Sequence, residues 1–259
     1  MKAPLAIVIV LSALLLALAP AGAGDLPFLP QTLVYQVSYE DQKLNLSAKP
    51  WAQRVLEVEQ PASSTVTIMP FDVQAGWARM TLEEPMRNQT TRVTELTFQT
   101  YPVLLWNKMS VVQKNAAGKV FRQESYDVSN PTFQYPTDLM SPYGLWMLAP
   151  TLELKQGSEK VLLIFMNPWI MARTTAKVDS RETVTVPAGT FACWKIVCTI
   201  WASDYFGSKV GALVQPFAPK YTLWLEAAAP HKVIKYRGAL GEMPNTTSII
   251  EVRELSSYK

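Results

Sequence analysis

Hydrophobic and polar residues alternate along most of this chain with the two-residue period that is typical of half-buried β-strands. In residues 32–39, for example, Leu33, Tyr35 and Val37 fall on one face and Gln36 falls on the other. Comparable runs recur roughly every ten residues with turn-forming residues between them, as in all-β domains. Strands are predicted at residues 32–39, 64–69, 75–82, 92–98, 105–113, 120–128, 160–166, 172–178, 182–186, 192–201, 221–226, 232–238 and 247–253.

The turn-forming and helix-capping residues between these runs predict a hairpin and a helix. Residues 115–119 form a short polar loop between two alternating runs, and Gly118 is available for a positive φ. Ser141 and Pro142 suit the N-cap and the first position of a helix, which residues 143–148 continue for about two turns. We therefore expect one short helix in a chain that no repeat or charged linker divides.

A structural turn is predicted where two further alternating runs meet. Pro187 sets the φ angle of the first corner of a type I turn, and Gly189 suits the left-handed position that follows. Phe191 lies where the second strand restarts. A second hairpin is expected over residues 221–236.

These motifs resemble a bacterial exported family of unknown function, catalogued as domain of unknown function 3108. The resemblance rests on the Val-Pro-Ala-Gly-Thr-Phe turn at residues 186–191, the Trp-bearing strand after it, and the Pro-x-Lys-Val-Ile-Lys run at residues 230–235. It covers residues 130–255 and implies a fold similar to that of the periplasmic lipoprotein carriers. The expected fold class is thus mainly β, a curved antiparallel sheet or half-barrel with one short helix in its concave face. The family brings no established catalytic residues.

The first 23 residues have the features of a secretory signal peptide. Lys2 provides a positive start, residues 5–18 are apolar, and Ala21 and Ala23 give the small-x-small pattern before a cleavage site. An apolar run of about 14 residues is shorter than the roughly 20 of a membrane-spanning helix, so an uncleaved anchor is less favoured. We expect residues 1–23 to be removed and residues 24–259 to form a single exported β domain, with the periplasm favoured over the cell exterior.

Composition and charge exclude some partners. The net charge is +3, and only 17% of the residues are charged against 49% hydrophobic. No basic stripe is visible, so a nucleic-acid partner is not expected.

The two cysteines, Cys193 and Cys198, lie five residues apart on one predicted strand. That spacing corresponds to roughly 16 Å and to opposite faces, whereas a disulfide needs about 4.4–6.8 Å between Cα atoms. Two buried free thiols are therefore expected. Because His231 is the single histidine, no metal site and no cofactor is predicted.

Catalytic chemistry finds little support in the residue pattern. His231 starts a predicted strand, where an exposed or hydrogen-bonded turn residue is favoured over a general base. Glu83 and Glu84 would face opposite ways on a strand, and we expect both to be solvated loop charges. The chain is therefore expected not to be an enzyme.

Three apolar connections are the candidate binding elements, at residues 143–148, 165–171 and 211–217. Connections are normally polar and exposed, so the apolar side chains of these three must be shielded from water by other groups. They either complete the core or line an apolar cavity; insertion into a membrane surface is less favoured, because basic residues are missing. The candidate ligand-binding residues are Tyr143, Trp146, Met166, Trp169, Met171 and Phe217.

The resulting hypothesis is a non-enzymatic envelope protein that binds an apolar or amphipathic ligand, such as a lipid or acyl chain. The alternative is an envelope protein–protein scaffold or accessory module, which would present an exposed apolar patch instead of a pocket.

Overall fold

The computed structural model describes residues 30–41, 61–72, 77–99, 105–127, 139–140, 142–148, 152–167, 170–218, 220–239 and 249–259. The predicted signal peptide lies outside these residues. The strands are β1 (Gln31–Asp41), β2 (Ser63–Asp72), β3 (Trp77–Pro85), β4 (Thr91–Gln99), β5 (Leu105–Lys114), β6 (Val120–Asp127), β7 (Leu139–Met140), β8 (Glu159–Asn167), β9 (Ile170–Val186), β10 (Gly189–Ile200), β11 (Lys220–Glu226), β12 (Val233–Ala239) and β13 (Ile249–Tyr258). The helical segments are η2 (Pro142–Met147), α3 (Ser203–Val214) and η4 (Gln215–Phe217).

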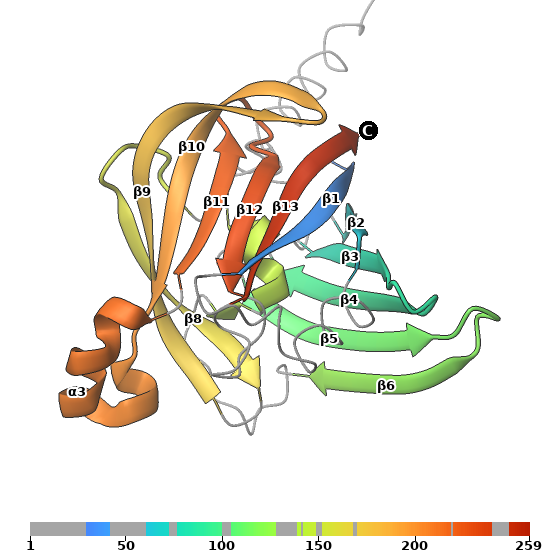
Figure 1. The fold of residues 1–259 in the computed structure, drawn as a ribbon, viewed down its shortest axis with the longest axis horizontal. Coiled ribbons are helices and arrows are strands. Elements are labelled where there is room, and N and C mark those ends of the chain that lie inside the picture. Colours follow the sequence, from blue (N-terminus) through green and yellow to red (C-terminus); the bar gives the residue numbers. More distant parts are fainter. Residues whose placement is uncertain are drawn as a thin grey trace, which may run out of the picture.

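All the strands belong to one sheet, in which the first and last strands of the chain are neighbours. The order is β6-β5-β4-β3-β2-β1-β13-β12-β11-β10-β9-β8-β7. Two antiparallel meanders therefore run outward from the central β1–β13 pair, and among the described strands only β7 pairs in parallel, with β8. Figure 1 shows the meanders as two walls, one from β9 to β13 and the other from β2 to β6.

The sheet curls strongly but is not closed by hydrogen bonds. Its two end strands are β6 and β7, and residues of β7 come within 8 Å of β5 between Cα atoms. The short helix η2 lies inside the curve (Figure 1). The predicted fold class, a curved antiparallel sheet or half-barrel with a short helix in its concave face, is confirmed.

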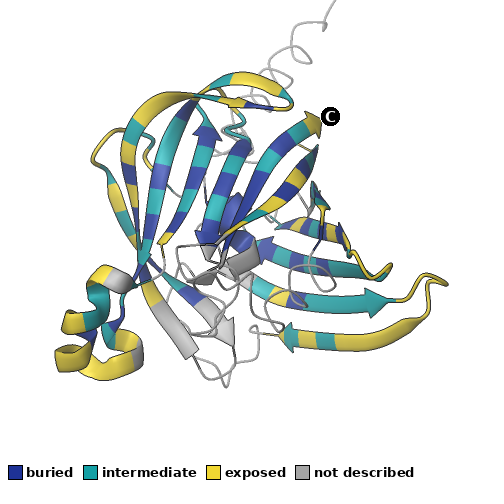
Figure 2. Cartoon of the chain, in the orientation of Figure 1, coloured by how far each residue is buried: buried dark blue, intermediate teal, exposed yellow. Residues whose placement is uncertain are grey.

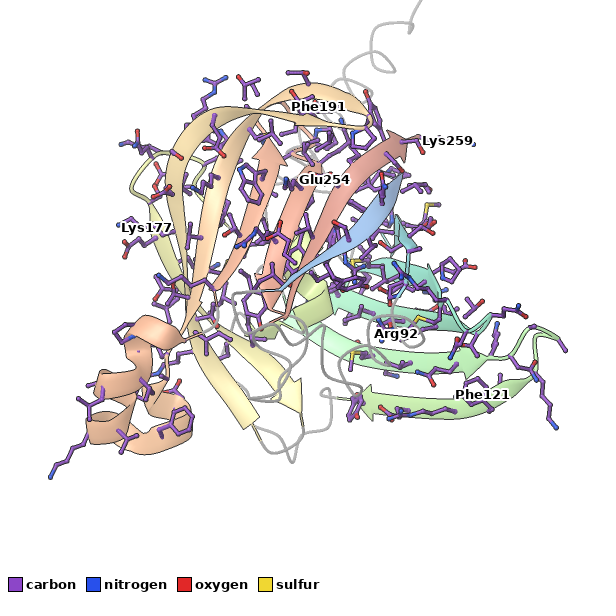
Figure 3. The ribbon with its side chains drawn as sticks, in the orientation of Figure 1. Arg92, Phe121, Lys177, Phe191, Glu254 and Lys259 are labelled. Carbon is purple, nitrogen blue, oxygen red and sulfur yellow. The ribbon has the colours of Figure 1, made fainter. Side chains whose placement is uncertain are left out.

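The predicted turn at Pro187 forms the tip of an arch over one end of the sheet. Strand β9 ends at Val186, and Gly189 adopts the positive φ, +135°, that was expected of it. The Ala188 N–H donates to the Leu255 carbonyl of β13 at 3.0 Å. Phe191, labelled on the arch in Figure 3, meets Tyr258 edge to face at 6.3 Å between ring centroids. The arch thus ties β9 and β10 to the centre of the sheet.

Two predictions about elements were wrong. The predicted break between residues 178 and 182 does not exist, because β9 continues through a bulge at Asp179, where Lys195 pairs with Ser180 but Ile196 pairs with Val178. Residues 211–217 were expected to be a connection, yet α3 and η4 occupy them. Within the described residues, no helix is long and apolar enough to cross a membrane.

The core lies on the concave face, where alternate side chains are buried along strands such as β3, β4 and β11, whereas β6 has no buried side chain (Figure 2). Gly238 of β12 belongs to this face, beside two tyrosines. A Cβ atom at Gly238 would lie 2.4 Å from Tyr221 Cδ1 and 2.4 Å from Tyr236 Oη. Both rings are buried and stacked at 6.4 Å, so neither has free space to move into. Glycine is required at position 238 because the two tyrosine side chains lie too close to the backbone for a Cβ atom to fit.

We expect Gly238→Ala to lower the free energy of unfolding by about 1–3 kcal/mol, because it overpacks the two rings. Urea denaturation of the variant and the wild type measures this. Ser257→Ala, at an exposed position near the end of β13, is the control and should change stability by less than about 0.5 kcal/mol. Equal stability of Gly238→Ala and wild type would show that the rings relax freely.

Candidate functional site

The short helix η2 presents a continuous buried apolar segment to the concave face. Leu145, Trp146, Met147 and Leu148 are each no more than 6% exposed. Leu145, Trp146 and Met147 belong to η2, and Leu148 follows it directly, so this part of the chain is enclosed on several sides. We call residues 145–148 the plug.

Trp146 fixes the plug to the centre of the sheet. Its indole Nε1–H donates to Tyr35 Oη at 3.0 Å, and the Tyr35 hydroxyl donates in turn to the Val233 carbonyl at 2.8 Å. The Trp146 ring also lies 5.4 Å from the ring of Tyr236 and 5.4 Å from Arg253 Cζ. One indole therefore contacts β1, β12 and β13.

Beside the plug, four charged side chains form an ion network on the same face of the sheet. Arg253 donates to Glu251 Oε1 at 2.5 Å and to Glu84 Oε1 at 2.8 Å. Glu84 Oε2 accepts from Arg92 at 2.7 Å. Arg253, Glu84 and Glu251 are buried, and Arg92, labelled on the right-hand wall in Figure 3, is partly exposed.

The network extends over five neighbouring strands, from β13 to β4. Arg253 of β13 reaches past β1 and β2 to Glu84 of β3, and Arg92 of β4 then adds a fifth strand. Burial alone would raise the pKa of Glu84, but the Arg253 and Arg92 charges hold it below its ordinary value. Burial alone would lower the pKa of Arg253, but Glu251 and Glu84 raise it. The Glu84 carboxylate and the Arg253 guanidinium are thus each held in the ionised form.

The structure places the predicted ligand-binding residues unevenly. Trp146 is buried on the concave face, and its role as a ligand-binding residue stays a prediction. Tyr143, Met166, Met171 and Phe217 lie in η2, β8, β9 and η4, but their side chains are outside the described part. Trp169 lies outside the described residues altogether. Whether these residues come together in one site therefore stays a prediction.

Sequence reasoning missed the ion network. Glu84 was expected to be a solvated loop charge, which is wrong, because its side chain is 0% exposed. Glu83, its neighbour, is exposed as expected. The signal that could have revealed it is the alternation along β3. Glu84 follows Met80 and Leu82 at two-residue intervals, so its carboxylate had to lie on the same buried, apolar face.

The groups considered for catalysis are not poised for it. His231 donates a hydrogen bond from Nδ1–H to the Glu226 carbonyl at 3.0 Å, as expected of a turn residue. Cys193 and Cys198 are free and buried, as predicted, and burial raises the pKa of each thiol to about 12. Among the residues that the structure describes, no cluster of three or more histidine, cysteine or acidic residues could hold a metal ion.

Comparison with known families locates the resemblance. Residues 104–210 match the DUF3108-like family model. The match confirms the resemblance to this family, and it contains both the arch and the plug. It ends before residues 221–236, so the second hairpin that was part of the expected resemblance lies outside the DUF3108-like segment. Glu84 and Arg253 also lie outside it.

Several solved structures are similar to this chain at low sequence identity. A β-barrel-like protein of domain of unknown function DUF1849 from Brucella abortus is 9% identical with a TM-score of 0.43, over 90% of this chain and 98% of that one. The hypothetical lipoprotein YmcC from Escherichia coli is 9% identical with a TM-score of 0.33, over 99% and 98%. The lipoprotein LppX from Mycobacterium tuberculosis is 13% identical with a TM-score of 0.31, over 88% and 85%. No curated protein matches the sequence.

We expect acid to weaken the fold through Glu84. Because the pKa of Glu84 is lowered in the folded state, the unfolded chain binds its proton first, and the free energy of unfolding falls as the pH drops below about 4.5. Glu84→Gln should remove this part of the pH dependence and cost about 3 kcal/mol at pH 7, because a buried pair is broken. Urea denaturation between pH 3 and pH 7 measures both effects.

Glu83→Gln is the matched control, since Glu83 is the exposed neighbour on the same strand. It should keep the wild-type stability at pH 7 and the wild-type slope with pH. Parallel pH profiles for the two variants would contradict the assigned role of Glu84.

Proposed function

We propose that the protein is an exported, non-catalytic envelope protein whose concave face holds an apolar or amphipathic ligand of the lipid class. The observation that carries this proposal is the plug, a separate apolar segment enclosed by an open curved sheet. The segment contributes no strand to the sheet, so it can leave without breaking strand pairing.

An acyl chain matches the plug in energetic terms. Burying one large apolar side chain contributes about 1.5–3 kcal/mol, so the three large aliphatic side chains Leu145, Met147 and Leu148 contribute on the order of 6 kcal/mol. At about 0.8 kcal/mol per methylene, eight methylenes of a ligand would replace that contribution. Common acyl chains exceed this length, so they can compete with the plug for the apolar face.

The polar chemistry of the concave face favours binding over catalysis. The Glu84 and Glu251 carboxylates each accept hydrogen bonds from Arg253. The raised pKa values of Cys193 and Cys198 keep both thiols protonated at neutral pH. These groups hold the fold together, and an apolar ligand would not need them to react.

The test is native mass spectrometry of the protein purified from its native envelope, before and after extraction with organic solvent. We expect a stoichiometric added mass that extraction releases as lipid. Trp146→Phe removes the hydrogen bond to Tyr35 and should speed lipid exchange by about fivefold, since a buried hydrogen bond contributes about 1 kcal/mol.

Trp224→Phe is the control for Trp146→Phe. Trp224 also donates its indole N–H, to the Glu182 carboxylate, but at an exposed site. The Trp224→Phe substitution should leave the rate of lipid exchange unchanged. If every preparation has the mass of the polypeptide alone and takes up no added lipid, the proposal is wrong.

An envelope interaction module is a second candidate function, and α3 is the observation that favours it. Phe206, Val210 and Leu213 are 59%, 50% and 76% exposed. The helix projects from one end of the sheet in Figure 1. Asp204 anchors it by accepting the Arg173 N–H at 2.8 Å and a guanidinium hydrogen bond at 2.6 Å. A firmly held apolar surface of this kind suits contact with a protein partner.

We expect a photocrosslinker placed at Leu213 to give one discrete adduct in the native envelope. The same crosslinker at Val161 is the control, because that side chain is 51% exposed on β8, away from α3. Gel analysis of the adducts measures the difference. Identical patterns at both positions, or none at either, would remove the support that α3 gives to this second function.

A further inference from the structure

Three buried polar groups around Glu84, on the concave face, lack a hydrogen-bond partner among the described residues. They are Ser64 Oγ, Thr94 Oγ1 and Arg253 Nη1. Ser64 and Thr94 are 0% exposed, and Arg253 is 3% exposed. Buried polar groups are normally satisfied, so three unsatisfied ones on one face require an explanation.

All three groups are neighbours of Glu84. Ser64 is one position beyond the Thr65–Glu83 pair, so it lies beside Glu84 on the adjacent strand. Thr94 pairs with Leu82, two residues before Glu84 on the same face. Arg253 donates directly to Glu84 through its other terminal nitrogen. They form one patch, which we call the polar patch.

The polar patch opposes stability unless something occupies it. Valine or alanine at positions 64 and 94 would avoid the cost of burying an unsatisfied hydroxyl. The neighbouring core positions, Val66 and Leu96, show that apolar side chains fit on the same strands. The chain therefore carries donors where the fold alone would favour hydrocarbon.

The charge of the patch is balanced within the protein. Arg253 and Arg92 carry two positive charges, and Glu84 and Glu251 carry two negative charges in contact with them. An anionic ligand would find no unpaired cation here and would lie close to two carboxylates. The groups left to bind a ligand are hydrogen-bond donors in a patch that carries no net charge, and such a patch suits a neutral hydrogen-bond acceptor.

We propose that the polar patch binds the carbonyl oxygens of a neutral, ester-linked lipid. Ser64, Thr94 and Arg253 Nη1 each donate to an acceptor on the ligand, while its acyl chains replace the plug. This inference rests on the proposed function and narrows it to one class of lipid, in which charged headgroups are disfavoured.

The experiment compares three probes on the full protein: dioleoylglycerol, oleate at pH 8 and hexadecane. Displacement of a fluorescent fatty-chain probe gives the affinity for each. We expect dioleoylglycerol to bind at least tenfold more tightly than oleate, and hexadecane to bind through the apolar face alone. Ser64→Ala combined with Thr94→Val should weaken dioleoylglycerol binding about tenfold, which corresponds to ~1.4 kcal/mol, and leave hexadecane binding unchanged.

Stability of the lipid-free protein is the second readout. The double variant should melt at the same temperature as the wild type or higher, because it removes unsatisfied buried hydroxyls. Thr174→Val is the matched control: its hydroxyl is also buried without a partner among the described residues, but it lies on β9, away from Glu84. It should leave dioleoylglycerol affinity unchanged.

The outcomes separate the two proposals. If hexadecane and dioleoylglycerol both fail to bind, the proposed lipid-binding function is wrong. If they bind but oleate binds as tightly as dioleoylglycerol, only the inference about the polar patch is overturned. A double variant that loses stability and keeps its dioleoylglycerol affinity would likewise overturn it, by showing that the hydroxyls serve the fold.

Discussion

The buried bridge between Arg253 and Glu84 is the constraint on which the rest of the structure depends. It joins the last strand of the chain to the third across β1 and β2, on the concave side. Hydrogen bonds between strands fix neighbours only, whereas this bridge fixes strands that are not neighbours. It therefore sets the curvature of the central part of the sheet. A buried pair of this kind contributes little net stability, but removing either partner alone leaves an expensive unpaired charge.

The arch adds a second restraint of the same kind at one end of the sheet. The Ala188 N–H reaches the Leu255 carbonyl, two residues from Arg253 on β13. Strand β13 is thus held by its neighbours β1 and β12, by the bridge and by the arch. This explains how a sheet that hydrogen bonds do not close still encloses a helical segment. The curvature is maintained by contacts across the concave side and does not depend on pairing between β6 and β7.

The alternation of hydrophobic and polar residues was sufficient to predict the strands other than β7, because most strands bury alternate side chains on the concave face. The turn at Pro187 and the helix after Ser141 were predictable from local turn and cap chemistry. Helix α3 could not be predicted in the same way, because its sequence contains two glycines, which normally disfavour a helix. Gly207 interrupts the helical backbone, and Gly211 is required because Ser203 lies very close to it. The network was hidden for another reason: Glu84 and Arg253 are 169 residues apart, and only the folded sheet brings them together.

Arg253 contacts both Glu84 and the Trp146 ring, and these two contacts differ greatly in strength. Under the proposed function, this difference separates the sheet, which stays fixed, from the plug, which a ligand would displace. Breaking its contact with Glu84 leaves a buried charge and costs about 3–5 kcal/mol. Its contact with the Trp146 ring contributes about 0.5–2 kcal/mol, and the Trp146 hydrogen bond to Tyr35 adds about 1 kcal/mol. The polar contacts of the plug are therefore weaker than the bridge. Under the proposed function, a ligand that replaces the apolar contacts of the plug would displace it while the curved sheet, held by Arg253 and Glu84, stays intact.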